Sequence, residues 1–251
     1  MSTGAMYPRG AIYAPHKLAA AEPFRTIRDP APAPACFITI PSQLSFWMNQ
    51  FDGCCVSSEE CFNIDLVATA TTGQPYVVDD HALQHFLRQY GLANGAPLTD
   101  VMDIMAQSGL PDNGSTFFDG GYRSVDWTNY DEFCAALWQT KGSVKLAVAA
   151  DQLQAVVQGG VSGWWLTSAQ TDRNIDHCIG SCGYGPAEYL SDMLKSLIPS
   201  RLAPATPSIA LFTWNSIGIA AHQAGLCPIT GESYSRSPAS IRKAANGATA
   251  V

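Results

Sequence analysis

The 251-residue sequence has few charged residues, 14% in all, and no apolar run near the roughly 18 residues that a membrane-spanning helix needs. Its first residues lack the charged segment and apolar stretch of a secretory signal. The eight cysteines are not spaced as densely as in a small disulfide scaffold. We therefore expect reduced thiols, a cytoplasmic or virion-associated location and no membrane partner.

The few charges are unevenly distributed. Residues 1–29 carry four basic and two acidic side chains, a net charge of +2, whereas the whole chain is −7 and the remainder is therefore −9. An acidic body argues against nucleic acid as a partner. A basic arm on an acidic body can dock on its own body, self-associate with a neighbouring copy, or stay solvated, and the composition leaves these alternatives open.

Hydrophobic residues make up 47% of the chain, which is ample for a core. Residues 29–35 read Asp-Pro-Ala-Pro-Ala-Pro-Ala, and alternating proline favours an extended, polyproline-like spacer. We interpret residues 1–40 as an extended N-terminal arm with a proline-rich linker.

Hydrophobic periodicity changes along the rest of the chain. It predicts helices over about 55–70, 81–90, 99–108 (capped by Thr99) and 129–139, and strands over 144–148, 175–181 and 208–214. A further helix over about 189–197 lies between the last two strands. The pattern predicts an α+β fold in which a helical half, residues 41–125, packs on a β-rich half, residues 126–251, with a cleft between them.

The sequence around Gly53-Cys54-Cys55-Val56 places cysteine at the start of a predicted helix, where Asp52 is a candidate N-cap. A helix N-terminus favours the thiolate form of a cysteine. Gln50 lies just upstream, and its amide can donate to an oxygen that becomes negative during acyl transfer. A pair of buried core thiols is the simpler reading of this motif alone, and the choice between Cys54 and Cys55 stays open.

Two later motifs add to the cysteine. Asp176-His177 begins an apolar stretch that ends in Gly-Tyr-Gly, and Asn215-Ser216-Ile217-Gly218 follows the last predicted strand. The order cysteine, histidine, asparagine resembles that of the papain-like cysteine peptidases. Asn-Gly-Ala-Pro at 94–97, the strand at 141–148 and Gly-Gly-Val at 159–161 resemble further family segments, so residues 40 to 235 are covered in order.

The resemblance implies a papain-like fold with a helical N-terminal half and a barrel-like β half. It implies a thiol hydrolase that cleaves a peptide or isopeptide bond in a peptide or protein substrate, with no cofactor and no metal. Cys55 would be the nucleophile, His177 its base and Asn215 the group that orients the ring. Gln50 and the Cys55 backbone N–H would form the oxyanion hole.

The sequence departs from the family pattern at several positions. Gln50 lies one residue closer to Cys55 than usual, so Asn49 is an alternative oxyanion donor. Val56 and Ile217 stand where the family has tryptophan, and the family's paired cysteines are not recognisable. The arm is shorter than the family's prosegments and lacks their long helix, which does not favour zymogen inhibition. Some phage and bacterial chains are similar around the nucleophile.

Three alternatives remain from the sequence. The first is a catalytically weak or inactive papain-like fold that serves as a virion or assembly component, with self-association through the arm. The second is amide hydrolysis on a non-peptide substrate such as peptidoglycan. The third is a zinc site at His177, Cys178 and Cys182, which strand geometry disfavours because neighbouring side chains point to opposite faces.

Overall fold

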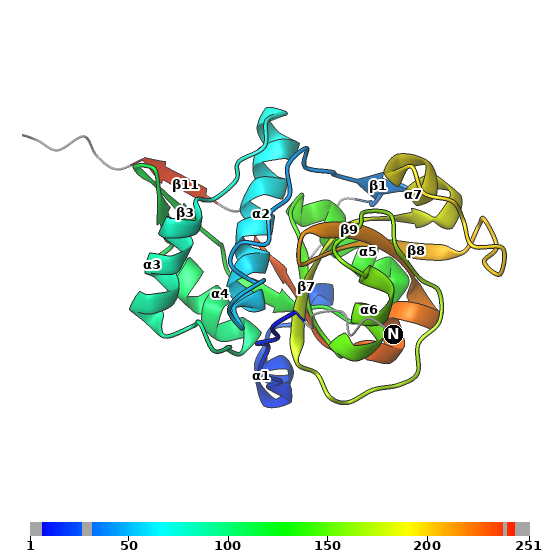
Figure 1. Ribbon diagram of the computed structural model, residues 1–251, viewed down its shortest axis with the longest axis horizontal. Coiled ribbons are helices and arrows are strands. Elements are labelled where there is room, and N and C mark those ends of the chain that lie inside the picture. Colours follow the sequence, from blue (N-terminus) through cyan, green and yellow to red (C-terminus); the bar gives the residue numbers. More distant parts are fainter. Residues whose placement is uncertain (1–6, 27–31, 238–239, 244–251) are drawn as a thin grey trace, which may run out of the picture.

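The computed structural model describes residues 7–26, 32–237 and 240–243, which fold into a helical half and a sheet half (Figure 1). The helical half contains α2 (Cys55–Thr72), α3 (Asp80–Tyr90) and α4 (Leu98–Gln107). It also carries a three-stranded sheet in the order β11-β3-β2, formed by Ser240–Lys243, Ser115–Phe118 and Leu110–Asp112. The expected α+β class is confirmed. The C-terminal strand β11 crosses back to pair with β3 of the helical half.

The sheet half is built on an eight-stranded sheet in the order β4-β10-β5-β7-β8-β9-β6, with β1 also pairing with β7. Only β6 and β9 run parallel among the strand pairs of this sheet in the described part of the chain. Its strands are β1 (Phe37–Ile38), β4 (Tyr122–Ser124), β5 (Val144–Val148), β6 (Trp165–Leu166), β7 (His177–Pro186), β8 (Pro207–Thr213), β9 (Ser216–Ala221) and β10 (Thr230–Arg236). The helices of this half are α5 (Tyr130–Thr140), α6 (Ala150–Val157) and α7 (Ala187–Leu194). Two short turns, η2 (His222–Leu226) and η3 (Cys227–Ile229), connect β9 to β10.

Most expected helices are present, with ends moved by a few residues. Asp79 caps α3 by accepting from the His81 N–H, and Asn129 caps α5 in the same manner. The expectation that Thr99 caps α4 was wrong, because this helix begins one residue earlier, directly after Pro97. The inserted helix α7 exists and likewise starts after a proline, Pro186. None of the helices in the described segments is long and apolar enough to span a bilayer.

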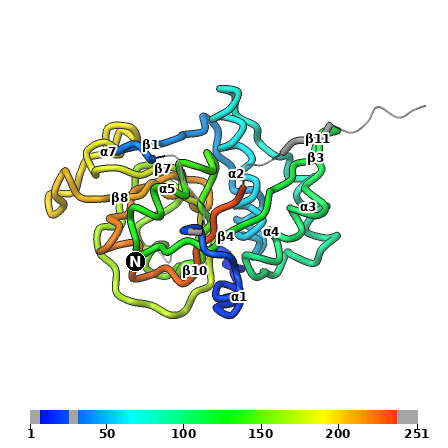
Figure 2. The backbone as a smooth tube through the Cα atoms, turned by 180° about the vertical axis from the view of Figure 1, so that it is seen from behind, coloured from blue at the N-terminus to red at the C-terminus, as the bar shows by residue number. Residues whose placement is uncertain are grey.

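The N-terminal arm packs on the body where the two halves meet (Figures 1 and 2). It forms α1 (Pro15–Ala20) and the short turn η1 (Phe24–Thr26). Phe24 is buried in the core, and Pro23 forms a bridge to Ser124 of β4. Part of the expected linker, residues 29–31, lies outside the described residues. Over residues 7–26, therefore, the arm is docked on its own body.

Helix α2 lies unusually close to β7, and a glycine makes this approach possible. A Cβ atom at Gly180 would meet the Glu59 carboxylate and the Phe62 ring, both at 2.9 Å. Phe62 stacks face to face on Phe212 of β8, with ring centroids 4.1 Å apart. The first twelve residues of α2, Cys55 to Leu66, are all buried, so the helix is the centre of the core rather than a surface element.

A buried group of charged side chains fixes α2 to the sheet. Lys145 of β5 pairs with Glu60 and lies 3.2 Å from Glu59. Arg236 of β10 pairs with both glutamates, at 2.7 Å from Glu59. Lys145 also donates to the Val56 carbonyl at 3.0 Å, in the first turn of α2. The cluster thus ties the beginning of α2 to two strands of the sheet.

The charges in this cluster are balanced. Burial alone would raise the pKa of Glu60, but Arg236 and Lys145 hold it at about 2. Burial and the neighbouring Glu60 raise the pKa of Asp119, which lies 3.7 Å from Arg236, well above its ordinary value, and this favours its neutral form. Two carboxylates then face two cations, which is the arrangement under which buried charges are tolerated.

We expect Lys145→Met to lower the free energy of unfolding by about 3–5 kcal/mol, because it leaves two buried carboxylates with one cation. Urea unfolding at pH 7 measures this, with Arg201→Ala, which removes an exposed cation, as the control. A loss below about 1 kcal/mol for Lys145→Met would contradict the role given to the cluster.

Candidate active site

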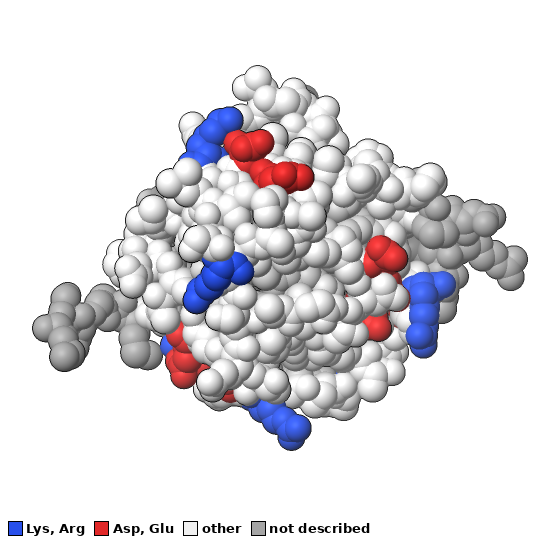
Figure 3. Space-filling model, turned by 90° about the vertical axis from the view of Figure 1, so that its right-hand side faces the viewer, with Lys and Arg blue, Asp and Glu red and all other residues white. Residues whose placement is uncertain are grey.

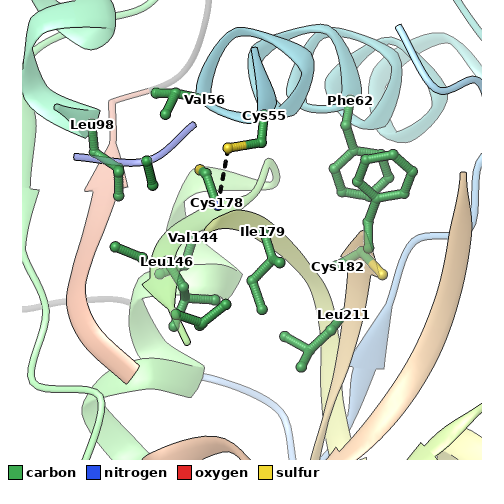
Figure 4. Packing of buried hydrophobic residues seen from close by; sticks show 14 of the residues in the cluster. Cys55, Val56, Phe62, Leu98, Val144, Leu146, Cys178, Ile179, Cys182 and Leu211 are labelled. Carbon is green, nitrogen blue, oxygen red and sulfur yellow. Dashed lines mark hydrogen bonds between the residues drawn. The ribbon is translucent and has the colours of Figure 1, made fainter. Parts of the chain in front are cut away.

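The two adjacent cysteines at the start of α2 point in different directions. Cys54 is the N-cap residue, and its Sγ lies against the Ser58 hydroxyl at 3.4 Å and the Trp47 carbonyl. Cys55 is the first helical residue, and its Sγ accepts a hydrogen bond from the Cys178 N–H at 3.3 Å (Figure 4). The expected capping role of Asp52 was wrong, since Cys54 takes that position. Of the two thiols, Cys55 faces the histidine strand.

His177 is the first residue of β7 and is fully buried. Its ring stacks on the Trp214 indole, with centroids 4.5 Å apart and planes 17° apart. Its Nε2 lies 2.8 Å from the Thr213 hydroxyl, whereas its Nδ1 is buried without a hydrogen-bond partner. The structure thus brings the Cys55 thiol next to the backbone of the residue that follows His177, without a hydrogen bond between thiol and ring.

Asn215 lies in the two-residue turn Trp214–Asn215 between β8 and β9. Its Oδ1 is buried without a partner, and a Cβ at Gly160 would approach it to 1.8 Å. The Gly-Gly segment therefore makes room for this amide. The contact expected from Asn215 to the His177 ring is not formed in this state, because Thr213 occupies Nε2 instead. The orienting role of Asn215 stays a prediction.

Sequence reasoning missed Thr213 and Trp214 as neighbours of the histidine. Trp214 covers one face of the ring. Both residues directly precede Asn215, but it is the pairing of β8 with β7, which no motif indicates, that brings them to the histidine.

The two candidate oxyanion donors lie in the turn that precedes α2. Asn49 is 2% exposed, Gln50 is half-buried, and the side-chain oxygen of each is buried without a partner. The turn is held by positive φ angles at Trp47 and Met48. The unpartnered atoms are acceptor oxygens, whereas an oxyanion is stabilised by the amide N–H groups, so the donor role of Asn49 and Gln50 stays a prediction.

The N-terminal arm runs directly across the cysteine. The Ala11 N–H donates to the Asp176 carbonyl at 3.0 Å, and the Ile12 N–H donates to the Ala96 carbonyl at 3.0 Å. The Ala96 N–H in turn donates to the Gly10 carbonyl at 2.9 Å, so arm and body pair in parallel. An extended peptide is thus bound between the helical half and the histidine strand.

Three glycines allow this close contact. A Cβ at Gly10 would lie 1.5 Å from the Gly53 carbonyl oxygen, and one at Gly53 would lie 2.7 Å from the Arg9 carbonyl oxygen. A Cβ at Gly95 would meet the Gly10 carbonyl oxygen at 2.5 Å. Backbone therefore packs on backbone immediately before α2, which only glycine permits.

Side chains of the arm fasten both its ends. Arg9 pairs with Asp176 at 2.9 Å and Asp151 at 2.6 Å. Tyr7 packs on Trp214, with ring centroids 5.1 Å apart. Farther along, Lys17 pairs with Asp100 of α4. Of the alternatives that the composition left open for the basic arm, residues 7–26 show docking on the body of the same chain.

The covered site keeps both candidate catalytic groups uncharged. Burial raises the pKa of the Cys55 thiol to about 11, and burial with the nearby Arg9 cation lowers the pKa of His177 to about 3. A thiolate–imidazolium pair is absent under these conditions. What the arrangement can do chemically depends on whether the arm leaves.

A second cysteine and histidine lie close together, away from this site. Cys227 Sγ is 3.6 Å from His222 Nε2. That same Nε2 donates to the Trp127 carbonyl at 2.7 Å, while Nδ1 lies 3.2 Å from the Gln223 amide nitrogen, which donates to it. The nitrogen that faces the thiol therefore carries the proton and cannot accept another. Burial raises the pKa of Cys227 to about 11.

The described residues include all eight cysteines, and none of them is in a disulfide. Within the same described ranges, no three His, Cys, Asp or Glu side chains are grouped so as to hold a metal ion. His177, Cys178 and Cys182 are accordingly not gathered into a ligand set.

Comparison with known proteins identifies the fold. No protein-family model matches the sequence, and no curated protein does. Solved structures do match. A digestive procathepsin L 3 from Tenebrio molitor larval midgut gives a TM-score of 0.57 at 14% identity, over 93% of this chain and 83% of that one. The proform of the ragweed pollen cysteine protease Amb a 11 gives a TM-score of 0.62 at 10% identity, over 92% of this chain and 75% of that one.

The bromelain protease of Ananas comosus, in complex with the E64 inhibitor, gives a TM-score of 0.56 at 12% identity, over 82% of this chain and 99% of that one. The chain therefore has the papain-like cysteine protease fold, as the sequence motifs indicated.

We expect Gly10→Ala in the full-length chain to speed alkylation of Cys55 by iodoacetamide at least about 10-fold at pH 7.5, because the added methyl group cannot coexist with the Gly53 carbonyl and the arm must lift. Mass spectrometry of peptides measures the rate. Gly121→Ala is the control, since a Cβ there meets nothing within 4 Å. Equal rates in wild type and both variants would contradict the covering role of the arm.

A buried neutral His177 also makes stability depend on pH. The His177 ring is protonated near pH 6.5 in the unfolded chain but only near pH 3 in the native protein. Its contribution to the free energy of unfolding is therefore complete above about pH 6.5 and falls as the pH is lowered toward 3. Between pH 6.5 and 4.5 we expect the free energy of unfolding of the wild type to fall by about 2–3 kcal/mol more than that of His177→Gln, as measured by urea unfolding. Identical pH profiles would show that the native ring is not held neutral.

Proposed function

We propose that this chain is a papain-like thiol hydrolase that cleaves a peptide or isopeptide bond, and that the arm holds it in a latent form. One observation carries the proposal. The cleft beside Cys55 binds an extended peptide, the chain's own residues 9–12, through backbone hydrogen bonds to Asp176 and Ala96. A cleft that forms hydrogen bonds to a peptide backbone in this way suits a polypeptide substrate.

The roles follow from the positions of the groups. With the Nε2 proton of His177 donated to Thr213, the lone pair of Nδ1 is left to accept the Cys55 thiol proton. The thiolate attacks the substrate carbonyl, and the oxyanion forms near the Cys55 N–H and the Asn49 or Gln50 amide. His177 returns the proton to the leaving amine, and water then hydrolyses the thioester with the same base. Departure of the arm brings water to the pair, which relieves the burial that keeps it neutral.

The comparisons support a peptide substrate without naming one. Two of the matching structures, bromelain and a Carica candamarcensis cysteine protease, are complexes with the inhibitor E-64. The two proform matches extend over 92–93% of this chain, against 82% for bromelain, which is consistent with an arm that behaves as a covering segment. These sources, a larval midgut, a pollen and Ananas comosus, lend no support to a phage origin.

One observation favours a non-catalytic role as the second candidate. The thiol and the imidazole are both neutral and not hydrogen-bonded to each other in the described form. If the arm never leaves, the fold serves as a binding or assembly module.

In the full-length Gly10→Ala variant we expect hydrolysis of quenched fluorogenic peptides near neutral pH, reduced at least about 10³-fold by a further Cys55→Ala change. Cys54→Ala, the matched control, should change kcat/KM by less than about 3-fold because its thiol faces Trp47 and Ser58. Isopeptide-linked peptides and peptidoglycan are assayed in parallel to define the bond class. A freely alkylated Cys55 with no hydrolysis of any of these substrates would favour the assembly module.

A further inference from the structure

The inserted segment after β7 forms one wall of a pocket next to the candidate catalytic residues. The pocket has a volume of about 400 Å³, within the range of natural ligand sites. Asn215 contributes to its inner end, and Lys195, just after α7, lies at its lining as well. The remaining lining is mainly apolar, formed by Ile40, Pro41, Leu44, Met193, Leu194 and Ile217.

The path of the arm shows which part of the cleft this pocket extends. Tyr7 packs on Trp214 and Phe46, Gly10 lies against Gly53 beside the nucleophile, and Ile12 reaches Ala96. The cleft therefore has a Trp214 end and an Ala96 end, with Cys55 between them. The pocket adjoins the Trp214 end, because Asn215 directly follows Trp214 and Leu44 lies two residues before Phe46.

The chemistry of the proposed reaction decides which part of a substrate lies there. His177 has to protonate the departing amine, so the leaving segment must lie on the side of the imidazole. The His177 ring is backed by Trp214, and the turn that holds Trp214 continues into Asn215 at the pocket. The pocket is thus on the leaving-group side of the cleaved bond.

We propose that this pocket binds an apolar side chain of the substrate segment that follows the cleaved bond. The proposal rests on the proposed thiol hydrolase function and narrows its substrate class to sequences with leucine, methionine or phenylalanine shortly after that bond. Met193 is 43% exposed, which leaves its side chain available to a ligand.

The surrounding surface suits an apolar ligand. The side of the molecule that carries α7 shows only a few scattered charges in Figure 3. An acidic side chain that entered the pocket would lose its hydration, and Lys195 is the one cation in the lining that could compensate for this loss. An apolar side chain would instead be stabilised by its removal from water. The pocket should therefore favour substrates with an apolar residue at this position over substrates with an acidic one.

The test uses the full-length Gly10→Ala chain with two peptide sets that differ only in having leucine or aspartate at the first, second or third position after the cleaved bond. We expect kcat/KM to favour leucine by at least about 10-fold at one of these positions. Met193→Glu should reduce that preference to below about 3-fold. Met193→Leu should keep it, and Leu197→Glu, which adds the same charge at a 91% exposed position outside the pocket, should keep it as well.

A reporter with a fluorescent amine directly after the cleaved carbonyl separates the two proposals. It has no residue to place in the pocket, so its turnover measures the thiol hydrolase step alone. Equal rates for leucine and aspartate peptides with normal turnover of the reporter would overturn the pocket assignment alone. Absence of turnover of both substrate types would instead overturn the thiol hydrolase function on which the pocket assignment rests.

Discussion

The close packing of α2 against β7 is the constraint on which the site depends. Gly180 gives the space for this contact, and the buried pairing of Glu59 and Glu60 with Lys145 and Arg236 holds it. Lys145 also reaches the carbonyl of Val56, the residue after Cys55. The position of the Cys55 sulfur above the Cys178 N–H is therefore set by a charged cluster deep in the core rather than by the loop that precedes the helix.

The arm acts on the site through solvent exclusion. With the arm docked, Cys55 and His177 are both buried, which raises the pKa of the thiol and lowers the pKa of the imidazole. Its attachment is mostly backbone to backbone at Gly10, Gly53 and Gly95, with Arg9 adding an ion pair to Asp176. One groove beside Cys55 thus holds the arm, and under the proposed function a substrate would occupy the same groove once the arm has left.

Much of the fold was predictable because periodicity and turn residues are local signals. The helices around Cys55, His81 and Asn129 and the strand from Val144 follow directly from them, and the α+β class was confirmed. The papain-like fold rested on ordered motifs and was also confirmed. The path of the arm was not predictable, because its contacts join residues far apart in sequence, as between Ala11 and Asp176. Thr213 was missed for the same reason, since strand pairing rather than a motif brings it to His177.

The protonation state of the His177 ring tests the central claim most directly. ¹⁵N NMR of the ring nitrogens can be recorded at pH 7 in the intact chain and in the full-length Gly10→Ala chain. The account predicts a neutral ring with its proton on Nε2 in the intact chain, and a ring protonated on both nitrogens, paired with the Cys55 thiolate, once the arm is displaced. A ring that stays neutral after displacement would contradict a catalytic cysteine–histidine pair.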